Sequence, residues 1–414
     1  MNFKKIFSII MILYFFITPT SSFADDYIED NSDFDVAIET SSDTSKTPNI
    51  NARHAVVLDR ESKTVLFGKN ENEQCKMAST TKIMTAIVVI ENCTNLNDVV
   101  TISKKSAGTG GSRLGLSTDD KITVENLLYG LMLVSGNDAA VALAEFIGGD
   151  IEGFASMMNN KASELGLKDT HFVTPHGLDF DDHYTTAHEL AIIADYALKN
   201  PTFAKIVKTS NYTININGNS KSIHNTNELL GYLDGVYGVK TGFTNGANRC
   251  LVTSCKRSNL DIICVVLGCD TKKDRTLDST QLINYTFDNF SVINLKEIID
   301  ENFVIWKNEH LNSFSINKGI SSKLELYLNE EQIPYNNIAI NNDSLNNIST
   351  NISFTSDYNA PLEANTVIGT MQVCVDNQNY FSIDILNNNT IYKKDVFYYF
   401  RAFLKNYFNY CITS

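Results

Sequence analysis

The sequence lacks the closely spaced ligand pairs that mark many metal sites, since it has neither a CxxC nor an HxxxH segment. Its eight cysteines show no disulfide-framework spacing, and a chain of 414 residues is long enough to form a stable core without such bridges. Four cysteines lie in or beside strongly apolar runs, where cysteine serves as a small apolar side chain. They are Cys250, Cys255, Cys264 and Cys269. We therefore expect buried thiols and no metal site.

Basic residues are scarce relative to acidic ones. The sequence has 34 Lys and Arg against 48 Asp and Glu, which gives a net charge of −14 at pH 7. A nucleic-acid-binding protein is expected to carry a basic face, so we expect no nucleic-acid partner. Part of the acidic excess lies near the N-terminus, and we interpret residues 25–47 as an acidic, disordered spacer.

The N-terminus has no apolar run long enough to span a membrane. Residues 6–17 supply about 12 apolar positions, whereas a spanning helix needs about 20. Lys4 and Lys5 precede this stretch, and Ala24 ends a small-residue cleavage site after it. This order is typical of a secretory signal peptide. We predict that residues 1–24 are a signal peptide and that the protein is exported.

Between residues 48 and 292, strand patterns lie at both ends and helical patterns lie between them. The expected strands cover residues 54–58, 64–67, 212–216, 235–240, 249–256 and 261–268. The expected helices cover residues 79–91, 123–134, 137–149, 153–165, 187–199 and 275–290. We expect the strands to form one sheet from distant segments, within an α/β domain over residues 48–292.

Residues 293–390 have a different character. They are rich in Asn, Ser and Ile, with short alternating runs such as residues 323–328 and 380–385. This pattern predicts a small all-β C-terminal domain.

Residues 391–414 combine aromatic and basic side chains, and we expect an amphipathic C-terminal helix there. On a helix, Arg401 and Lys405 share one face, which suits a helix lying in a membrane interface. Another face carries Phe400, Phe403, Leu404 and Tyr407. Packing of this helix on its own domain is the alternative, and the local positive charge and terminal position favour the membrane.

Three short motifs follow one another in the central region: Ser79-Thr80-Thr81-Lys82, Ser135-Gly136-Asn137 and Lys240-Thr241-Gly242. Taken singly, they are explained as a helix cap, a helix stop and a strand end. Their order, with about 50 and then about 100 residues between them, indicates acyl transfer through a serine ester.

Ser79 is the expected nucleophile and Lys82 its base. A serine hydroxyl attacks poorly unless a base takes its proton, and Lys82 lies three residues later on the same face of the expected helix. Burial and a second cation, which Lys240 can supply, would lower the pKa of the lysine toward neutrality. The Ser79 backbone N–H lies at the helix start, where it is free to help bind an oxyanion.

The second motif supplies the proton path. Ser135 can relay a proton between Lys82 and the leaving amine. Asn137 can hold Lys82 and the substrate amide in place, because the motif lies at the junction of two expected helices.

The third motif supplies the substrate's binding edge. It is expected at the end of a strand on a sheet edge, where an extended peptide can bind by strand addition. Lys240 and Thr241 offer a cation and a hydroxyl to a carboxylate, and Gly242 leaves room for close approach. The Phe243 N–H is the expected second oxyanion donor.

With their flanking residues, 78–86, 134–140 and 238–244, the motifs resemble those of D-alanyl-D-alanine carboxypeptidases among the low-molecular-mass penicillin-binding proteins. Residues 174–178 and 183–187 also resemble segments of this family. The likeness covers about residues 50–290, and the C-terminal layout is similar although it carries no specific motif.

The resemblance implies a β-lactamase/transpeptidase-like fold, with an antiparallel sheet, flanking helices and a helical subdomain. It implies a serine carboxypeptidase, needing no cofactor, on the outer face of the cytoplasmic membrane or in the cell wall. The enzyme would remove the terminal D-alanine from peptidoglycan stem peptides, and β-lactams would acylate Ser79. Arg275 resembles a family arginine near the substrate carboxylate, whereas His176, His183 and His188 are expected to be structural.

Three alternatives stay in view. A class A β-lactamase needs a deacylating Glu in an ExxLN-type segment about 35 residues after SxN, but residues 168–172 read Lys-Asp-Thr-His-Phe and Glu164 precedes an expected helix end. We therefore expect slow β-lactam turnover. A transpeptidase would pass the acyl group to an amine, which the sequence leaves open. A non-catalytic penicillin- or peptidoglycan-binding membrane protein would not need the complete proton relay.

Overall fold

The computed structural model describes residues 47–413, except for the side chains of residue 346 and residues 408–413. The expected signal peptide and all but the last residue of the expected spacer lie outside the described residues. The chain forms two compact units. The first contains residues 47–57, Phe67–Lys256 and Ile262–Ile283, and the second contains Leu58–Leu66, Arg257–Asp261 and the chain from Asn284 onward.

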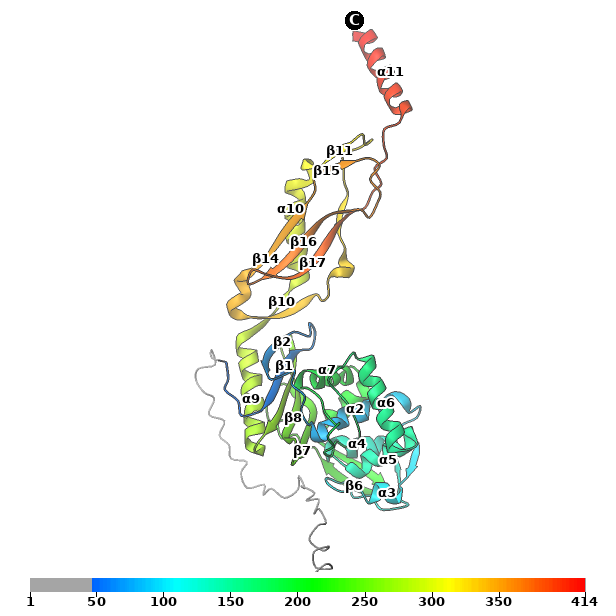
Figure 1. Ribbon diagram of the computed structural model, residues 1–414, viewed down its shortest axis with the longest axis vertical. Helices are drawn as coiled ribbons and strands as arrows, with labels where there is room; N and C mark the ends of the chain where they lie inside the picture. The colour runs from blue at the N-terminus through cyan, green and yellow to red at the C-terminus, as the bar shows by residue number, and fades with distance from the viewer. Residues whose placement is uncertain (1–46, 414) are drawn as a thin grey trace, which may run out of the picture. The chain divides into compact units, whose positions relative to one another are not determined.

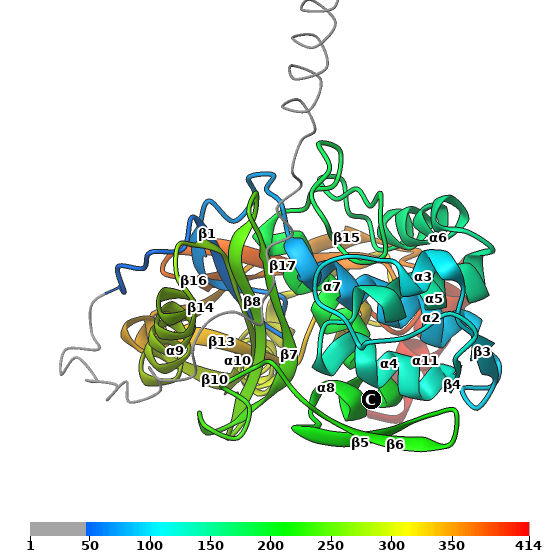
Figure 2. The same ribbon diagram turned by 90° about the horizontal axis from the view of Figure 1, so that it is seen from below.

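A five-stranded sheet joins strands from distant parts of the sequence, as expected, but the strand expected at residues 212–216 is not part of it and lies in a separate hairpin (Figure 1). Its strand order is β2 (Val65–Lys69), β1 (His54–Asp59), β9 (Leu260–Cys269), β8 (Asn248–Arg257) and β7 (Val236–Thr244). Helix α9 (Lys272–Asn289) covers one face and the helical region covers the other (Figure 2). Both faces are therefore shielded from water, which explains the nearly continuous apolar runs of β8 and β9. The four cysteines of these runs are buried free thiols.

Helices fill most of the chain between β2 and β7. They are the 3₁₀ turn η2 (Ala78–Thr81), α2 (Lys82–Asn92), α3 (Lys104–Ala107), α4 (Val124–Leu133), α5 (Asn137–Gly148), α6 (Ile151–Glu164), α7 (Ala187–Leu198) and α8 (Pro201–Val207). Two small hairpins accompany them: β3 (Val99–Thr101) with β4 (Lys121–Thr123), and β5 (Asn211–Ile216) with β6 (Asn219–His224). The sequence pattern predicts only a helix end at Asn200 and Pro201. Instead these residues cap and open α8, because proline fits the first helical position, where no N–H donor is needed.

Strand β7 extends further than the sequence pattern predicts. The expected strand ends at Lys240, whereas β7 continues to Thr244 and holds the Lys-Thr-Gly motif in its interior. The expected strand end was wrong because Gly242 and Thr244 still pair with residues of β8, and this ladder keeps a glycine in the strand. β7 is one of the two edge strands of the sheet, so one of its sides has no partner strand among the residues that the structure describes.

The second unit contains the β-rich domain expected for residues 293–390. A four-stranded sheet runs in the order β12 (Leu326–Leu328), β17 (Gln378–Asn387), β16 (Val367–Val375) and β14 (Ile348–Phe354). Two strand pairs complete it: β10 (Phe290–Asn294) with β13 (Asn337–Asn341), and β11 (Ser315–Asn317) with β15 (Asp357–Asn359).

One helix in this unit contradicts the expectation of strands alone. Helix α10 (Leu295–His310) follows β10 and packs its apolar face into the core of the domain. That face consists of Leu295, Ile299, Phe303 and Trp306, which recur at helical spacing. The periodicity is readable in the sequence, but the surrounding Asn- and Ile-rich composition favoured strands.

Two hairpin turns of the five-stranded sheet belong to the second unit, which the expected boundary at residues 292 and 293 did not foresee. In this unit the Thr64 hydroxyl lies 3.0 Å from the Tyr380 hydroxyl, and the Asn337 amide donates to Glu61 at 2.8 Å. These pairs join residues that are far apart in sequence, so composition along the chain could not predict them.

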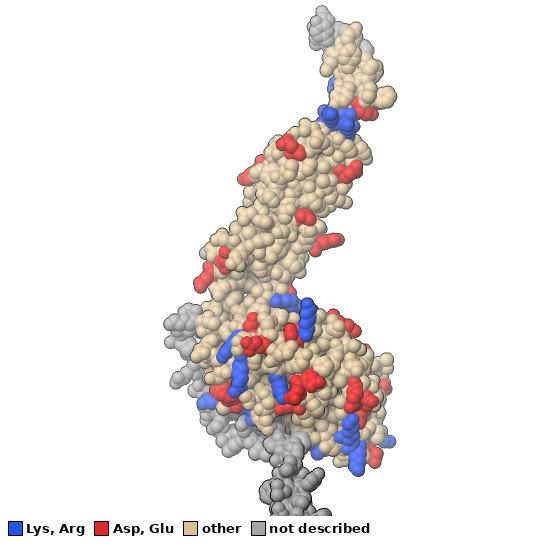
Figure 3. Space-filling model, in the orientation of Figure 1, with Lys and Arg blue, Asp and Glu red and all other residues tan. Residues whose placement is uncertain are grey.

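The C-terminal helix α11 (Val396–Thr413) begins five residues later than expected. Residues 391 and 393 still form bridges to Leu362 and Gly319 in the β-rich domain, so the helix starts beyond them. Lys and Arg side chains gather where α11 begins (Figure 3), and Lys393 and Lys394 precede the helix. Within residues 47–413, no helix is long and apolar enough to cross a bilayer.

Candidate active site

Ser79 and Lys82 lie at the junction of η2 and α2. The sequence predicts an α-helix from Ser79, but the chain makes one 3₁₀ turn first and the α-helix starts at Lys82. The Lys82 side chain is fully buried and Ser79 is 8% exposed. The expected pair is therefore formed, in a place that excludes most water.

The Lys82 ammonium group donates hydrogen bonds to three oxygens. They are Ser79 Oγ at 2.8 Å, Asn137 Oδ1 at 2.7 Å and the His176 carbonyl at 2.8 Å. A protonated lysine has three N–H donors, and these contacts match them. After loss of one proton, Asn137 and His176 can keep the two remaining donors, so the free lone pair faces the Ser79 hydroxyl. The geometry suits transfer of the Ser79 proton to Lys82.

The second motif lies beside this contact. Asn137, the first residue of α5, is oriented at both ends, because its Oδ1 accepts from Lys82 and its Nδ2 donates to the Gly110 carbonyl at 2.8 Å. Ser135 is buried with a φ of 60°. Its Oγ forms no hydrogen bond to another described residue. The structure thus joins Asn137 to Lys82 directly, but not Ser135.

A buried carboxylate next to Asn137 shapes the loop around it. Asp138 accepts hydrogen bonds from the backbone N–H groups of Leu114 and Gly115, both at 2.8 Å, and from Leu116 at 3.0 Å. The loop in turn supports Asn137, because the Asn137 N–H donates to the Ser112 carbonyl at 2.8 Å. The sequence analysis did not single out Asp138, although its place directly after the SxN motif could have drawn attention to it.

The third motif runs along the edge strand next to Ser79. A Cβ atom added to Gly242 would lie 3.1 Å from the Ser79 backbone nitrogen, so this position has almost no room for a side chain. The Thr241 hydroxyl lies 2.7 Å from the Thr226 hydroxyl. Lys240 is 1% exposed and its ammonium donates to the Thr241 carbonyl at 2.9 Å. The strand therefore runs close against the backbone of Ser79 at Gly242.

Phe243 follows the motif on the same strand. Its ring packs against the Arg249 guanidinium, whose central carbon lies 3.7 Å from the ring centre. Arg249 is its cross-strand partner on β8, and a cation over an aromatic face is a favourable contact. The packing fixes the strand where the Phe243 N–H is expected to act.

A family model described as D-alanyl-D-alanine carboxypeptidase matches residues 41–271, which is more than half of the chain. The chain belongs to the D-alanyl-D-alanine carboxypeptidase family. A second model, described as the C-terminal domain of penicillin-binding protein 5, matches residues 301–393. The resemblance drawn from the three motifs is thereby confirmed, together with the fold class.

Individual relatives and solved structures support the same family assignment. The D-alanyl-D-alanine carboxypeptidase DacF of Bacillus subtilis is 34% identical over 332 residues, covering 79% of this chain and 82% of the relative. A solved structure of penicillin binding protein 5 from Haemophilus influenzae has a TM-score of 0.67 at 27% identity, covering 84% of this chain and 99% of that one. The Streptomyces K15 DD-transpeptidase structure has a TM-score of 0.56 at 37% identity, covering 59% of this chain and 99% of that one.

Arg275, expected near the substrate carboxylate, lies in the first turn of α9 and is 3% exposed. Its Nη2 donates to both carboxylate oxygens of Glu228, at 2.8 and 2.7 Å. Arg275 is therefore held by a carboxylate of the carboxypeptidase itself. Glu228 was missed in the sequence, where nothing marks it apart from its position after the Asn-Thr-Asn run that contains Thr226.

Two of the histidines expected to be structural form a support behind the nucleophile. His183 Nδ1 accepts from the Val173 N–H at 3.0 Å, so the ring proton lies on Nε2 and donates to Thr81 Oγ1 at 2.8 Å. Burial, together with the nearby Lys82 charge, lowers the pKa of His176 to about 3. Burial, with smaller effects of His171 and Lys82, lowers the pKa of His183 to about 4. These rings are therefore neutral at pH 7. The role of His176 in the site comes from its backbone carbonyl, which residue type alone cannot reveal.

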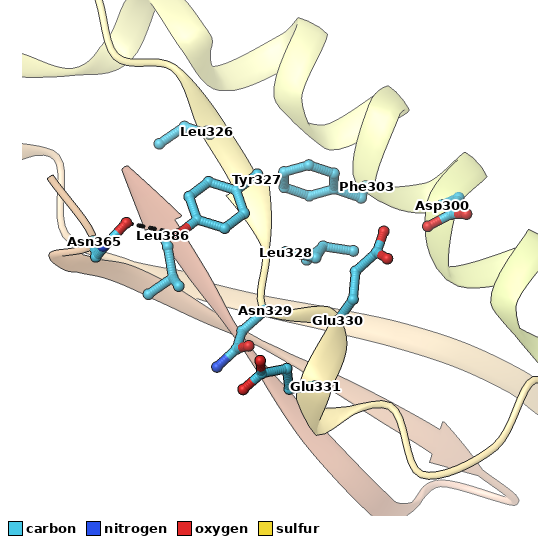
Figure 4. Close-up of a pocket in the computed structure, with 10 residues that line it drawn as sticks. All are labelled: Asp300, Phe303, Leu326, Tyr327, Leu328, Asn329, Glu330, Glu331, Asn365 and Leu386. Atoms are coloured by element: carbon cyan, nitrogen blue, oxygen red, sulfur yellow. Dashed lines mark hydrogen bonds between the residues drawn. The ribbon is translucent and has the colours of Figure 1, made fainter. Parts of the chain in front are cut away.

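A pocket in the second unit of this carboxypeptidase family member carries none of this chemistry (Figure 4). Its floor is apolar, with Phe303, Leu326 and Leu328, and acidic residues such as Glu330 line one side. Lys296 pairs with Glu330 at 3.2 Å. The lining has no serine, cysteine or histidine, so it offers no nucleophile of the kind that Ser79 provides.

Proposed function

We propose that this chain is a serine-type D-alanyl-D-alanine carboxypeptidase that removes the terminal D-alanine from peptidoglycan stem peptides through an acyl-enzyme on Ser79. The observation that carries the proposal is the set of three contacts of the Lys82 ammonium group, with Ser79 Oγ at 2.8 Å. The membership of the chain in the carboxypeptidase family supports the reaction class.

Acylation begins when neutral Lys82 takes the Ser79 proton. The Ser79 oxygen then attacks the carbonyl between the two D-alanines, and the backbone N–H groups of Ser79 and Phe243 stabilise the negative charge on the carbonyl oxygen. Collapse of this intermediate breaks the C–N bond, and the leaving amine takes a proton from Lys82 through the Ser135 hydroxyl. Water then hydrolyses the ester, and Ser79 regains its proton.

The substrate's position follows from the edge strand. An extended peptide can add to the free side of β7, with its terminal carboxylate near Lys240, Thr241 and Arg275. The side-chain oxygen of Asn137 accepts from Lys82, and one of the two N–H donors of its amide group remains available for the substrate. β-Lactams carry a carboxylate and a strained amide, so they are expected to acylate Ser79 and to leave slowly.

Intact-protein mass spectrometry after benzylpenicillin tests the nucleophile. The native protein and a Ser156→Ala control, changed on an exposed face of α6, should gain one penicillin adduct, whereas Ser79→Ala should gain none. D-alanine release from a peptide ending in D-Ala-D-Ala should follow the same pattern. An adduct on Ser79→Ala would place the nucleophile elsewhere.

Transfer to an amine is a second activity that one comparison favours. The K15 protein is described as a D-alanyl-D-alanine carboxypeptidase among the curated relatives and as a DD-transpeptidase among the solved structures. Product analysis with and without an added amine acceptor separates the two outcomes. Rapid turnover of nitrocefin would instead indicate a β-lactamase, which the absence of a matching Glu segment disfavours.

Export and membrane attachment complete the proposal. Helix α11 exposes large apolar side chains, including Phe397, Phe400, Phe403 and Tyr407, each more than half exposed, which suits insertion into a membrane interface. The full chain without its signal peptide should float with phospholipid vesicles, and Phe400→Ser with Phe403→Ser should abolish flotation. If both proteins stay in the soluble fraction, α11 is not a membrane anchor.

A further inference from the structure

Glu228 connects the third motif with the start of α9. It lies two residues after Thr226, whose hydroxyl contacts that of Thr241 at 2.7 Å. Its carboxylate accepts both hydrogen bonds from Arg275 Nη2 and lies 2.9 Å from the Lys272 ammonium. The side chains of Glu228 and Arg275 are 9% and 4% exposed, so little water screens their interaction.

Glu228 is ionised in this setting. Burial alone would raise its pKa, but the charges of Arg275 and Lys272 outweigh this effect and the pKa is lowered. The group of three therefore holds two positive charges and one negative charge. Because Glu228 already accepts from Arg275, a substrate carboxylate in this region meets a guanidinium whose charge is largely balanced.

The affinity of the Arg275 region for a substrate carboxylate matters at two steps of the proposed reaction. This region binds the terminal D-alanine before acylation, and it binds the freed D-alanine, or another D-amino acid, next to the acyl-enzyme. An amino acid held there can attack the Ser79 ester with its amine. A peptide bond forms as the ester bond breaks, and the proton that the amine loses passes by way of Lys82 to the Ser79 oxygen, which becomes a hydroxyl again. An amino acid that leaves quickly gives its place to water.

We propose that Glu228 is a positioning residue that acts through Arg275 to weaken retention of carboxylate-bearing amino acids, and so directs the acyl-enzyme toward hydrolysis rather than D-amino-acid exchange. This inference rests on the proposed function. It assigns Glu228 no contact with the reacting atoms.

The test measures the ratio of exchange to hydrolysis, using a D-Ala-D-Ala peptide and isotopically labelled D-alanine as the acceptor. In Glu228→Gln, which keeps the shape and one acceptor but loses the charge, the ratio should rise about threefold to tenfold, because one nearby charge is removed. With D-alaninamide, which has no carboxylate, the ratio should not change. In a protein that already carries Arg275→Gln, adding Glu228→Gln should change the ratio of exchange to hydrolysis little.

Lys272→Gln gives an independent check if Glu228→Gln folds poorly by thermal unfolding. Loss of this cation should lower the exchange ratio with D-alanine, whereas Lys273→Gln, at the exposed neighbouring position, should leave it unchanged. An unaltered ratio in folded Glu228→Gln, or an equal rise with D-alaninamide, would overturn the proposal. A native protein that releases no D-alanine would instead refute the proposed function.

Discussion

The first unit and the chain from residue 290 onward bury different kinds of side chain. In the first unit, Lys82, Asp138, Lys240 and Arg275 are all less than 4% exposed, and the contacts described above pair each with an oxygen or nitrogen partner. In the described chain from residue 290 onward, no charged side chain is buried, and the core is aliphatic and aromatic. Burial of a charge costs several kcal/mol unless it is paired, so the first unit carries a cost that the chain from residue 290 onward avoids. The comparison favours the first unit for the proposed chemistry without reference to any motif.

The largest expected difference between the units concerns lysine. Lys82→Met removes the proposed base while roughly keeping the side chain's volume, so the rate of penicillin acylation should fall by about 10²- to 10⁴-fold. Lys307→Met, the matched change in the second unit, removes a contact of 2.7 Å to the Leu326 carbonyl and should leave that rate unchanged. Stopped-flow acylation with a fluorescent penicillin measures both. A fast Lys82→Met protein would show that another group is the base.

The next largest expected effect is a loss of stability that is confined to the second unit. Trp306 packs against Phe303, Phe314 and Phe354, so Trp306→Ala should lower that unit's stability by about 3 to 5 kcal/mol. Hydrogen exchange of peptides from each unit measures the change, with the exposed Val304→Ala on the same helix as the control. Equal loss of protection in the first unit, or loss of acylation, would break the separation of packing from catalysis.

Acid should weaken the first unit through its histidines. His183 has a folded-state pKa of about 4 against an ordinary value of 6.5, so the unfolded chain binds a proton more readily between these values. Its contribution to stability is complete above pH 6.5 and is lost as the pH falls toward 4, by about 3 kcal/mol. Urea titrations at several pH values should show this slope, and His183→Gln should reduce it. The same slope in His183→Gln and in the control His188→Gln would assign it to other groups.

A smaller effect should follow from the loop around Asn137. Asp138→Asn keeps the size of the side chain but replaces one acceptor oxygen by a donor facing backbone N–H groups, which should cost about 1 to 3 kcal/mol. Acylation should slow as well, because the loop supports Asn137. Asp119→Asn is the control, since residue 119 is exposed and has a positive φ that Asn tolerates. A normal acylation rate in destabilised Asp138→Asn would separate loop support from catalysis.

The sequence predicted best the features that repeat or that depend on nearby residues. The strands of the sheet and most helices follow from periodicity and capping residues such as Thr123 and Thr186. Lys82 lies near Ser79 because three residues on a helical turn bring side chains to one face. The approach of Lys82 to Asn137 could be inferred only from the order of the motifs.

Other features depend on long-range contacts that no local pattern records. The His176 carbonyl is a backbone atom, and the pairing of Glu228 with Arg275 joins residues that are 47 positions apart. The full length of β7 depends on its ladder with β8. Helix α10 is a different case, since its periodicity was present and the composition around it was misleading.

The turn that carries Thr64 has a consequence for biogenesis. Thr64 meets Tyr380, which is 316 residues later in the chain, so the second unit combines one of the earliest described segments with one of the last. Formation of such distant contacts is slow and has to wait until both segments are available. If the chain is exported as a thread, as proposed above, the second unit can be completed only after nearly all of the described chain has left the cell interior.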